Sequence, residues 1–353
     1  MNACIIMATI RSTDAIGEYA KNAVQNKHTP DFIIIDEDPQ NRKAIQNQLQ
    51  GLHVDFYGAK ERSEWFQNHC LGEVSNVIPH KYHNKVSFGM LVALTRKYDM
   101  LVFVDDDTYP FMNVDFLGEH WKNLNTQYDS CYSKNSDWVN SHPFLFARGF
   151  PYNQRLPKDC FSKKCDAPPI LSLGLWAGIP DLNAIDYICY NIQYQHSLTV
   201  SNFSVGKNQF APIGGMNVAF KPEIIPAYYQ MFFADRFEDI FSGIFLLKIT
   251  SHLGFCVNIG NPIITHKKAP RDYFDDSIIE MSTLKFNEQL WQIVKSVELS
   301  NTTWLTCYRE LASKLLQKVA ECSNPQYLKT MAEKMLLWCD IVEHIQDIVG
   351  KSK

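Results

Sequence analysis

The chain has 353 residues with 46% hydrophobic content, enough for one large domain or two smaller ones with a buried core. A formal net charge of −4 and a pI near 6.3 provide no cationic surface for nucleic acid or for an anionic membrane. No apolar run approaches the ~18 residues of a membrane span, the N-terminus lacks a secretory signal, and the ten scattered cysteines favour reduced thiols in a cytoplasmic protein.

Apolar and amphipathic segments alternate over the first hundred residues. Residues 4–10, 32–35 and 53–57 are predicted to form strands, and residues 15–25 and 85–97 are predicted to form helices. Alternation of this kind is typical of an α/β fold with a doubly wound, mostly parallel sheet flanked by helices.

Residues 100–104, MLVFV, form an unbroken apolar run that is typical of a strand buried on both faces. Three carboxylates follow at once, Asp105, Asp106 and Asp107. A divalent cation explains this cluster, because hard oxygen ligands suit Mg²⁺ or Mn²⁺, which neutralises their charge. Asp105 and Asp107 can face the same ion while Asp106 points elsewhere, since side chains alternate along extended chain. A solvated acidic turn is the alternative, but open α/β sheets bind ligands at the carboxyl ends of their strands.

A nucleotide fits this layout. The acids that follow the second strand, Asp36 and Asp38 among them, are well placed to bond ribose hydroxyls. Neither GxGxxG nor GxxxxGK[ST] occurs, so metal and side chains must hold a diphosphate in place of a glycine cradle. Arg11, Asn84 and Lys85 are the nearest cationic or amide side chains, and for each of them a plain surface role is equally open.

Two later segments combine polar or glycine residues with a predicted element. Gly214 and Gly215 precede a strand, where paired glycines mark either a bulge or a close approach of the backbone to a ligand. Glu238 and Asp239 lie at the start of a helix predicted for residues 235–248, where the helix dipole favours carboxylates. Simple complementation of that dipole is the alternative to a catalytic role.

A histidine follows the strand predicted at residues 254–264. His266 can complete a metal site there, and the two lysines after it, Lys267 and Lys268, can meet a phosphate. A structural histidine is the alternative.

The remaining parts of the chain carry no catalytic constellation. Residues 130–166 lack periodicity and are predicted to be a long active-site loop region, whereas residues 286–349 contain three apolar stripes at helical spacing. Asn324 and Pro325 begin the third helix and Gly350 ends it. These helices are expected to pack on the core or to form a subunit contact. Two domains are therefore predicted. Residues 1–285 form the catalytic domain, and residues 286–353 form a C-terminal helical extension.

Taken together, the motifs occur in the order expected for one family. They are TIR at 9–11, DED at 36–38, VDDD at 104–107, RGFPYNQR at 148–155, GLWAGIPD at 174–181, GGMNVAF at 214–220, RFEDIFSG at 236–243 and THKKA at 265–269. Over roughly residues 3–275 the chain resembles the reversibly glycosylated polypeptides, whose characterised members are UDP-arabinopyranose mutases. The resemblance implies a GT-A-like glycosyltransferase fold.

The resemblance also implies a set of site residues. Asp105 and Asp107 would hold Mn²⁺ or Mg²⁺ on the UDP diphosphate, and His266 matches a late ligand of metal or diphosphate. Arg155 matches the arginine that the family glycosylates on itself, but Gln154 stands where the family usually has Leu, and Leu156-Pro157 stands where it has Glu-Gly. The residues expected to contact the UDP-sugar are Thr9, Arg11, Asp36, Asp38, Lys85, Asp106, Gly215 and Lys268.

The expected function is that of a metal-dependent UDP-arabinopyranose mutase, in which Asp239 or Glu238 stabilises the oxocarbenium-like sugar or orients a hydroxyl. A glycosyltransferase with a separate acceptor uses the same donor site and is the first alternative. A non-catalytic nucleotide-sugar-binding subunit is the second. The expected location is the cytoplasm or, in a eukaryote, the periphery of the Golgi, and the family makes a homo- or hetero-oligomer an expectation.

Overall fold

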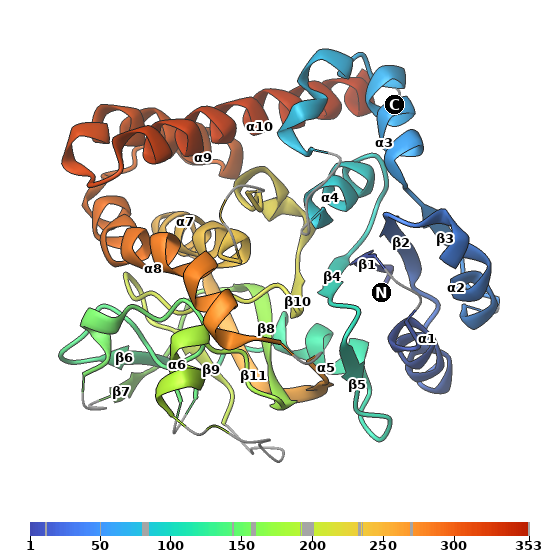
Figure 1. Cartoon of the computed structure of the whole chain (residues 1–353), viewed down its shortest axis with the longest axis horizontal. Helices are drawn as coiled ribbons and strands as arrows, with labels where there is room; N and C mark the ends of the chain where they lie inside the picture. Colours follow the sequence, from blue (N-terminus) through green and yellow to red (C-terminus); the bar gives the residue numbers. More distant parts are fainter. Residues whose placement is uncertain are drawn as a thin grey trace.

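A single mixed sheet organises the fold (Figure 1). The computed structural model describes residues 1–10, 13–49, 51–79, 85–142, 145–156, 160–190, 192, 201–231, 234, 236–268 and 271–351. The strands are β1 (Ala3–Thr9), β2 (Asp31–Asp36), β3 (Val54–Phe56), β4 (Met100–Val104), β5 (Thr108–Pro110), β6 (Ser130–Ser133), β7 (Cys160–Lys163), β8 (Pro169–Gly178), β9 (Phe203–Val205), β10 (Asn217–Phe220) and β11 (Cys256–His266).

The strands follow the order β3-β2-β1-β4-β10-β8-β11-β9-β6-β7, and β5 pairs with β11 outside this path. From β3 to β11, β10 is reversed while the other six strands share one direction. The carboxyl ends of β2, β1 and β4 therefore meet at one edge of the sheet. The predicted α/β architecture with a largely parallel sheet is confirmed.

Helices cover both faces of the sheet. They are α1 (Ala15–Gln25), α2 (Arg42–Gln48), α3 (Ala59–Asn68), α4 (Val86–Leu94), α5 (Phe116–Asn123), α6 (Ala184–Cys189), α7 (Glu238–Leu253), α8 (Tyr273–Ser296), α9 (Trp304–Gln317) and α10 (Pro325–Lys351), with 3₁₀ turns η1 (Pro39–Asn41), η2 (Gly72–Val77), η3 (Tyr152–Gln154), η4 (Pro222–Ala227) and η5 (Val319–Glu321). Within the described ranges, no helix is long and apolar enough to cross a membrane.

Alternate side chains of the central strands enter two separate cores. Phe103 of β4 points into the core that contains α4, α7 and the C-terminal helices, whereas Val102 and Val104 point into the core under α1 and α5. Because strand side chains alternate with period two, a strand covered on both faces needs apolar residues at every position. This explains why residues 100–104 are apolar throughout.

The C-terminal helices belong to the larger core, as one of the two predicted roles requires. Trp338 of α10 is fully buried, its ring stacks on Tyr229 at 4.9 Å, and its Nε1 donates to the Ile225 carbonyl at 3.2 Å. In Figure 1, α9 and α10 lie side by side along one edge of the molecule. The predicted boundary between the two domains, at residues 285 and 286, falls inside α8. The division into two domains stays a prediction.

Several predicted elements differ from the structure. The helices α2 and α3 were not predicted, because they are short and carry few apolar residues. The region 130–166 contains the paired strands β6 and β7, whose polar residues hide any alternation. Gly350 does not end the last helix, since α10 continues to Lys351. The helix predicted from residue 286 begins at Tyr273 instead, because its first half has acids inside and apolar side chains outside.

Candidate active site

The three aspartates lie at the carboxyl end of β4, beside the loop that leads into the reversed strand β10. Val104 of β4 pairs with Asn217, so Asp105 follows next to the Gly214–Met216 turn. The Asp105 side chain retains access to solvent, yet protein surrounds it closely. Desolvation raises the pKa of Asp105 well above its usual value, and the charges of Asp107 and Asp239 raise it further. The site therefore concentrates more negative charge than its own residues neutralise.

His266 is brought to this cluster by the pairing of β5 with β11, which sets it opposite Thr108. Its Nδ1 lies 2.8 Å from the Ile179 carbonyl oxygen, which can only accept, so Nδ1 carries a hydrogen. In the neutral ring the lone pair is then on Nε2, which lies 3.7 Å from Asp107 Oδ2. The backbone of Lys267 donates to the Asp107 carbonyl at 2.9 Å and holds the two segments together.

These donors suit a hard divalent cation. Carboxylate oxygens and a histidine nitrogen with a free lone pair are ligands of Mn²⁺ and Mg²⁺, and a carbonyl partner on the other ring nitrogen is the usual way of orienting such a histidine. Within the described ranges, no three His, Cys, Asp or Glu side chains are grouped to hold an ion by themselves. A cation here would take further ligands from phosphate oxygens, as Mg²⁺ commonly does.

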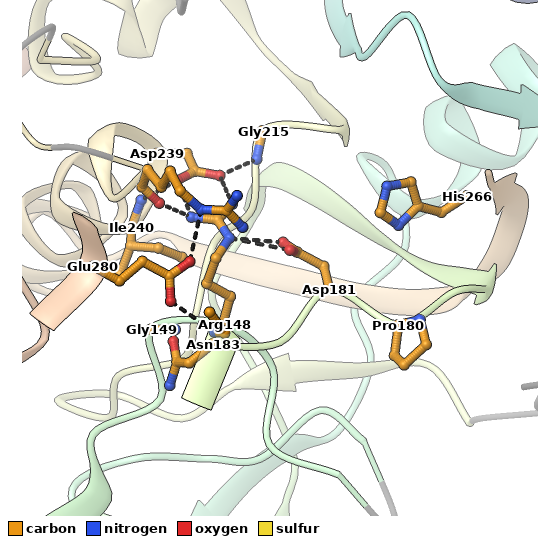
Figure 2. A network of polar contacts seen from close by, with 12 residues as sticks. Arg148, Gly149, Pro180, Asp181, Asn183, Gly215, Asp239, Ile240, His266 and Glu280 are labelled. Carbon is orange, nitrogen blue, oxygen red and sulfur yellow. Dashed lines mark hydrogen bonds and ion pairs between the residues drawn. The ribbon is translucent and has the colours of Figure 1, made fainter. Parts of the chain in front are cut away.

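One guanidinium joins two carboxylates beside the aspartates, and Figure 2 shows Arg148 between Asp181 and Asp239. Arg148 Nε lies 3.1 and 3.0 Å from the two Asp181 oxygens, and its Nη1 and Nη2 donate to Asp239 at 3.0 and 2.7 Å. Asp239, in the first turn of α7, also accepts from the Gly215 backbone at 2.9 Å. Both oxygens of the Asp239 carboxylate therefore accept hydrogen bonds, which fix the orientation of the side chain.

The Asp181 carboxylate of this cluster is ionised. Burial raises the pKa of Asp181, but the charges of Arg148 and Lys268 outweigh it, and the pKa is lowered to about 2. The pKa of Arg148 is raised well above its usual value, because Asp181 and Asp239 outweigh its desolvation. Two cations, Arg148 and Lys268, therefore act on the Asp181 carboxylate.

The carbonyl of Arg236 accepts a short hydrogen bond from Arg148 Nη1, which extends the network toward α8. Arg236 adopts a φ of 67°, in the left-handed region that a non-glycine residue enters at a cost. Its side chain pairs with Asp276 at 3.2 Å and with Glu280 at 2.6 Å. Glu280 in turn accepts from the Ala184 backbone at 2.7 Å, where α6 begins. The candidate site is thus tied to α6 and α8 by buried ion pairs.

Lys268 places a buried ammonium group near the same carboxylates. Its Nζ lies 4.7 and 5.3 Å from the ring centroids of Tyr187 and Tyr273 and has no hydrogen-bond partner in the described part of the chain. Burial lowers the pKa of Lys268 to about 8, against the opposing charge of Asp181. A buried ammonium without a hydrogen-bonding acceptor is suited to an anionic ligand such as a phosphate.

An open cavity of about 440 Å³ adjoins the aspartates on the side of α1. Thr9 Oγ1 donates to Asp106 Oδ2 at 2.8 Å, and Thr13 Oγ1 donates to the Asp106 carbonyl at 2.6 Å. This volume lies within the range of small-ligand sites. The cavity is lined by Thr13, Asp14, Gln48, Asp106, Asp107, Tyr109 and Lys267.

The acids after β2 form ion pairs of their own. Asp36 is almost fully buried, and Arg42 donates to both of its oxygens at 2.7 and 3.0 Å. Asp38 caps η1 by accepting from the Gln40 backbone at 3.0 Å. Lys85 is buried against Glu37. Its pKa is lowered, because desolvation outweighs that pair.

Other predicted site residues are distributed around the network. Glu238 is the buried first residue of α7. Arg155 donates to both oxygens of Asp186 at 2.7 and 2.9 Å, and its guanidinium lies 3.8 Å from the Tyr152 ring centroid. Arg11 and Asn84 lie outside the described residues.

The sequence assigned no role to Arg148 and Asp181, although each lies in a motif used for the resemblance. Their opposite charges were visible, but 33 residues separate them and Asp239 is 91 residues from Arg148. No local pattern predicts such a pairing.

Known proteins resemble the whole chain. The sequence model of the family described as "Reversibly glycosylated polypeptide" matches residues 2–347. "Probable UDP-arabinopyranose mutase 4" of Arabidopsis thaliana is 24% identical over 99% of this chain and 92% of its own length. "UDP-arabinopyranose mutase 1" of the same plant is 27% identical over 95% and 90%. A crystal structure of Mycobacterium tuberculosis glucosyl-3-phosphoglycerate synthase is 11% identical, covers 82% of this chain and 80% of its own, and has a TM-score of 0.42.

Proposed function

Because this chain belongs to the reversibly glycosylated polypeptide family, we propose that it is a UDP-sugar enzyme, a mutase that interconverts the pyranose and furanose forms of UDP-arabinose. Family membership and the names of the relatives support the reaction class. The observation that carries the proposal is the position of Asp107, which lines the open cavity and lies 3.7 Å from His266 Nε2. Its charge also acts on the neighbouring Asp105 carboxyl.

In this proposal, the UDP-sugar lies along the aspartates. Asp105, Asp107 and His266 would hold Mn²⁺ or Mg²⁺, which as a Lewis acid stabilises negative charge that develops on the diphosphate. The ammonium of Lys268, which has no hydrogen-bond acceptor among the described residues, is proposed to bind a phosphate oxygen. The uridine is proposed to lie among the side chains of Thr9, Asp106, Asp36, Asp38, Lys85 and Arg11.

The sugar is proposed to face Asp239. Two guanidinium nitrogens and the Gly215 N–H hold this carboxylate in one orientation, so it does not reorganise when positive charge develops on the ring. Asp239 is therefore the proposed stabiliser of the oxocarbenium-like sugar, and Glu238 supports it from the adjacent position of α7.

A glycosyltransferase with a separate acceptor is the second candidate, and one contact favours it. Arg155 matches the arginine that the family glycosylates, but both of its terminal nitrogens donate to Asp186. Attack by a guanidinium nitrogen requires that pair to break, which favours an acceptor from outside the chain.

The test is a product assay with UDP-arabinopyranose and Mn²⁺, run on the wild type and on Asp107→Ala. Asp347→Ala, which removes an exposed carboxylate of α10, is the matched control. We expect furanose product from the wild type and the control, and a loss of at least about a hundredfold from D107A. Product that forms only with an added acceptor would move the assignment to a transferase. Nucleotide binding without either product would indicate a non-catalytic, nucleotide-sugar-binding subunit.

The proposed location of the protein is the cytoplasm.

A further inference from the structure

The first half of α8 turns its apolar side chains outward. Phe274, Ile278, Ile279 and Met281 are exposed by 68%, 76%, 49% and 49%. Residues 274, 278 and 281 recur at helical spacing, so they form one stripe. An amphipathic helix on a protein surface normally buries such a stripe.

Buried ion pairs hold the helix in this inverted orientation. Asp276 and Glu280, on the opposite side, are buried by 95% or more. Arg236 pairs with both acids, and Arg271 Nε lies 2.8 Å from Asp276 Oδ2. Turning the stripe inward would break these pairs and leave charges unpartnered, at high cost.

The exposed stripe continues onto neighbouring segments. Of the eleven large hydrophobic side chains that are exposed in the described part of the chain, six belong to α8, α6 or η3, and Tyr190 and Leu156 follow shortly after α6 and η3. These segments contact one another, since α6 packs on α8 and the Tyr152 backbone donates to Glu288 of α8 at 2.6 Å. Besides the four residues of α8, the patch contains Tyr152, Leu156, Ile188 and Tyr190. Clustered apolar exposure of this kind marks an interaction site.

The charges on this face indicate what covers it. Asp275 and Lys285 are both exposed on the outward side of α8, ten positions apart, which is about 15 Å along a helix. A second α8 lying antiparallel about a two-fold axis near residue 280 sets Asp275 opposite Lys285 twice, and sets Ile279 opposite Met281. A membrane-surface helix would instead carry an excess of Lys and Arg beside its apolar face, whereas here the exposed Asp272 and Asp275 balance the exposed Arg271 and Lys285.

We propose that the outward face of α8, with its continuation on α6 and η3, is the contact between two copies of this chain. The contact is isologous, with the apolar stripe at its centre and the Asp275–Lys285 pairs at its ends. The buried acids Asp276 and Glu280 serve to present this face, which explains their inward position.

The test measures the sedimentation of the full chain over a wide range of concentration. We expect the wild type to form a dimer. Ile278→Asp should weaken dimerisation roughly a hundredfold, since it places a charge at the centre of the contact. Val24→Asp, which changes a side chain of α1 that is also exposed, should leave the dimer intact. Far-UV circular dichroism spectra that match the wild type would show that the variants fold.

Charge exchange makes the test specific for antiparallel pairing. Asp275→Lys alone places like charges together and should weaken the dimer at least about tenfold. The double variant D275K/K285D restores both pairs and should restore the dimer. A wild type that stays monomeric, an I278D dimer as tight as the wild type, or a double variant no better than D275K would each overturn the proposal. Binding of the monomer to anionic phosphatidylserine vesicles through Ile278 would assign the face to a membrane and would likewise overturn it.

Discussion

Replacing Arg148 by methionine tests whether one guanidinium holds two buried carboxylates at the site. The side chains of Arg148, Asp181 and Asp239 are only 10%, 10% and 7% exposed. Removing one partner of a buried ion pair costs ~3–5 kcal/mol, because the charge left behind has no partner. Since two carboxylates lose theirs, we expect R148M to lower the free energy of unfolding by about 5 kcal/mol, the upper end of that range. This corresponds to a Tm lowered by about 7 °C in a chain of this size.

The assay is urea unfolding at neutral pH, supported by thermal melts. Arg148→Lys keeps the charge but loses the fork that reaches both carboxylates, so it should be intermediate. Arg309→Met is the matched control, because Arg309 also pairs with two carboxylates but on the surface, and it should cost less than about 1 kcal/mol. Neutralising both partners in R148M/D181N/D239N should recover most of the loss. An R148M protein within about 1 kcal/mol of the wild type, or a triple variant as unstable as R148M, would refute the reasoning.

Three further predictions concern other residues. Burial lowers the pKa of His120 to about 4, so the folded state binds fewer protons than the unfolded state between pH 6.5 and 4. Stability should therefore fall by about 3 kcal/mol as the pH drops through that window, at ~1.4 kcal/mol per pKa unit, and an identical slope in His120→Gln would contradict this. Gly149 has a φ of +83°, and a Cβ there would lie 2.4 Å from Ile240, so Gly149→Ala should destabilise by about 2–4 kcal/mol more than Gly254→Ala, which shares the φ but meets nothing within 4 Å. Arg155 should carry no sugar by intact-mass analysis after incubation with UDP-arabinose, because both of its terminal nitrogens donate to Asp186, and a modified peptide at this residue would disprove the expectation.

Elements with strong local signals agree with the sequence prediction. The helix α1 occupies the predicted residues 15–25, β4 occupies residues 100–104, and α10 begins at Pro325 as its cap predicts. Glu238 and Asp239 lie in the first turn of a helix as expected, although α7 begins at Glu238 and not at the predicted residue 235. Periodicity, caps and first-turn acids act within a few residues of one another, so a short stretch of sequence contains the information they need.

Part of the candidate site could also be anticipated. Carboxylates after one strand and a histidine after another were predicted to meet, and Asp107 does lie beside His266. Their proximity follows because parallel strands of an α/β sheet bring their carboxyl ends to one edge, whatever their separation in sequence. The metal site itself stays a prediction.

The sequence by itself therefore determined the α/β architecture and the aspartates at the edge of the sheet. Only the tertiary structure decided that Arg148 joins Asp181 to Asp239, and that α8 buries Glu280 while it exposes Ile278. A charged side chain is stable inside a protein only when a partner from another segment meets it. That partner is fixed by the packing of distant segments, so no pattern within one segment reveals it.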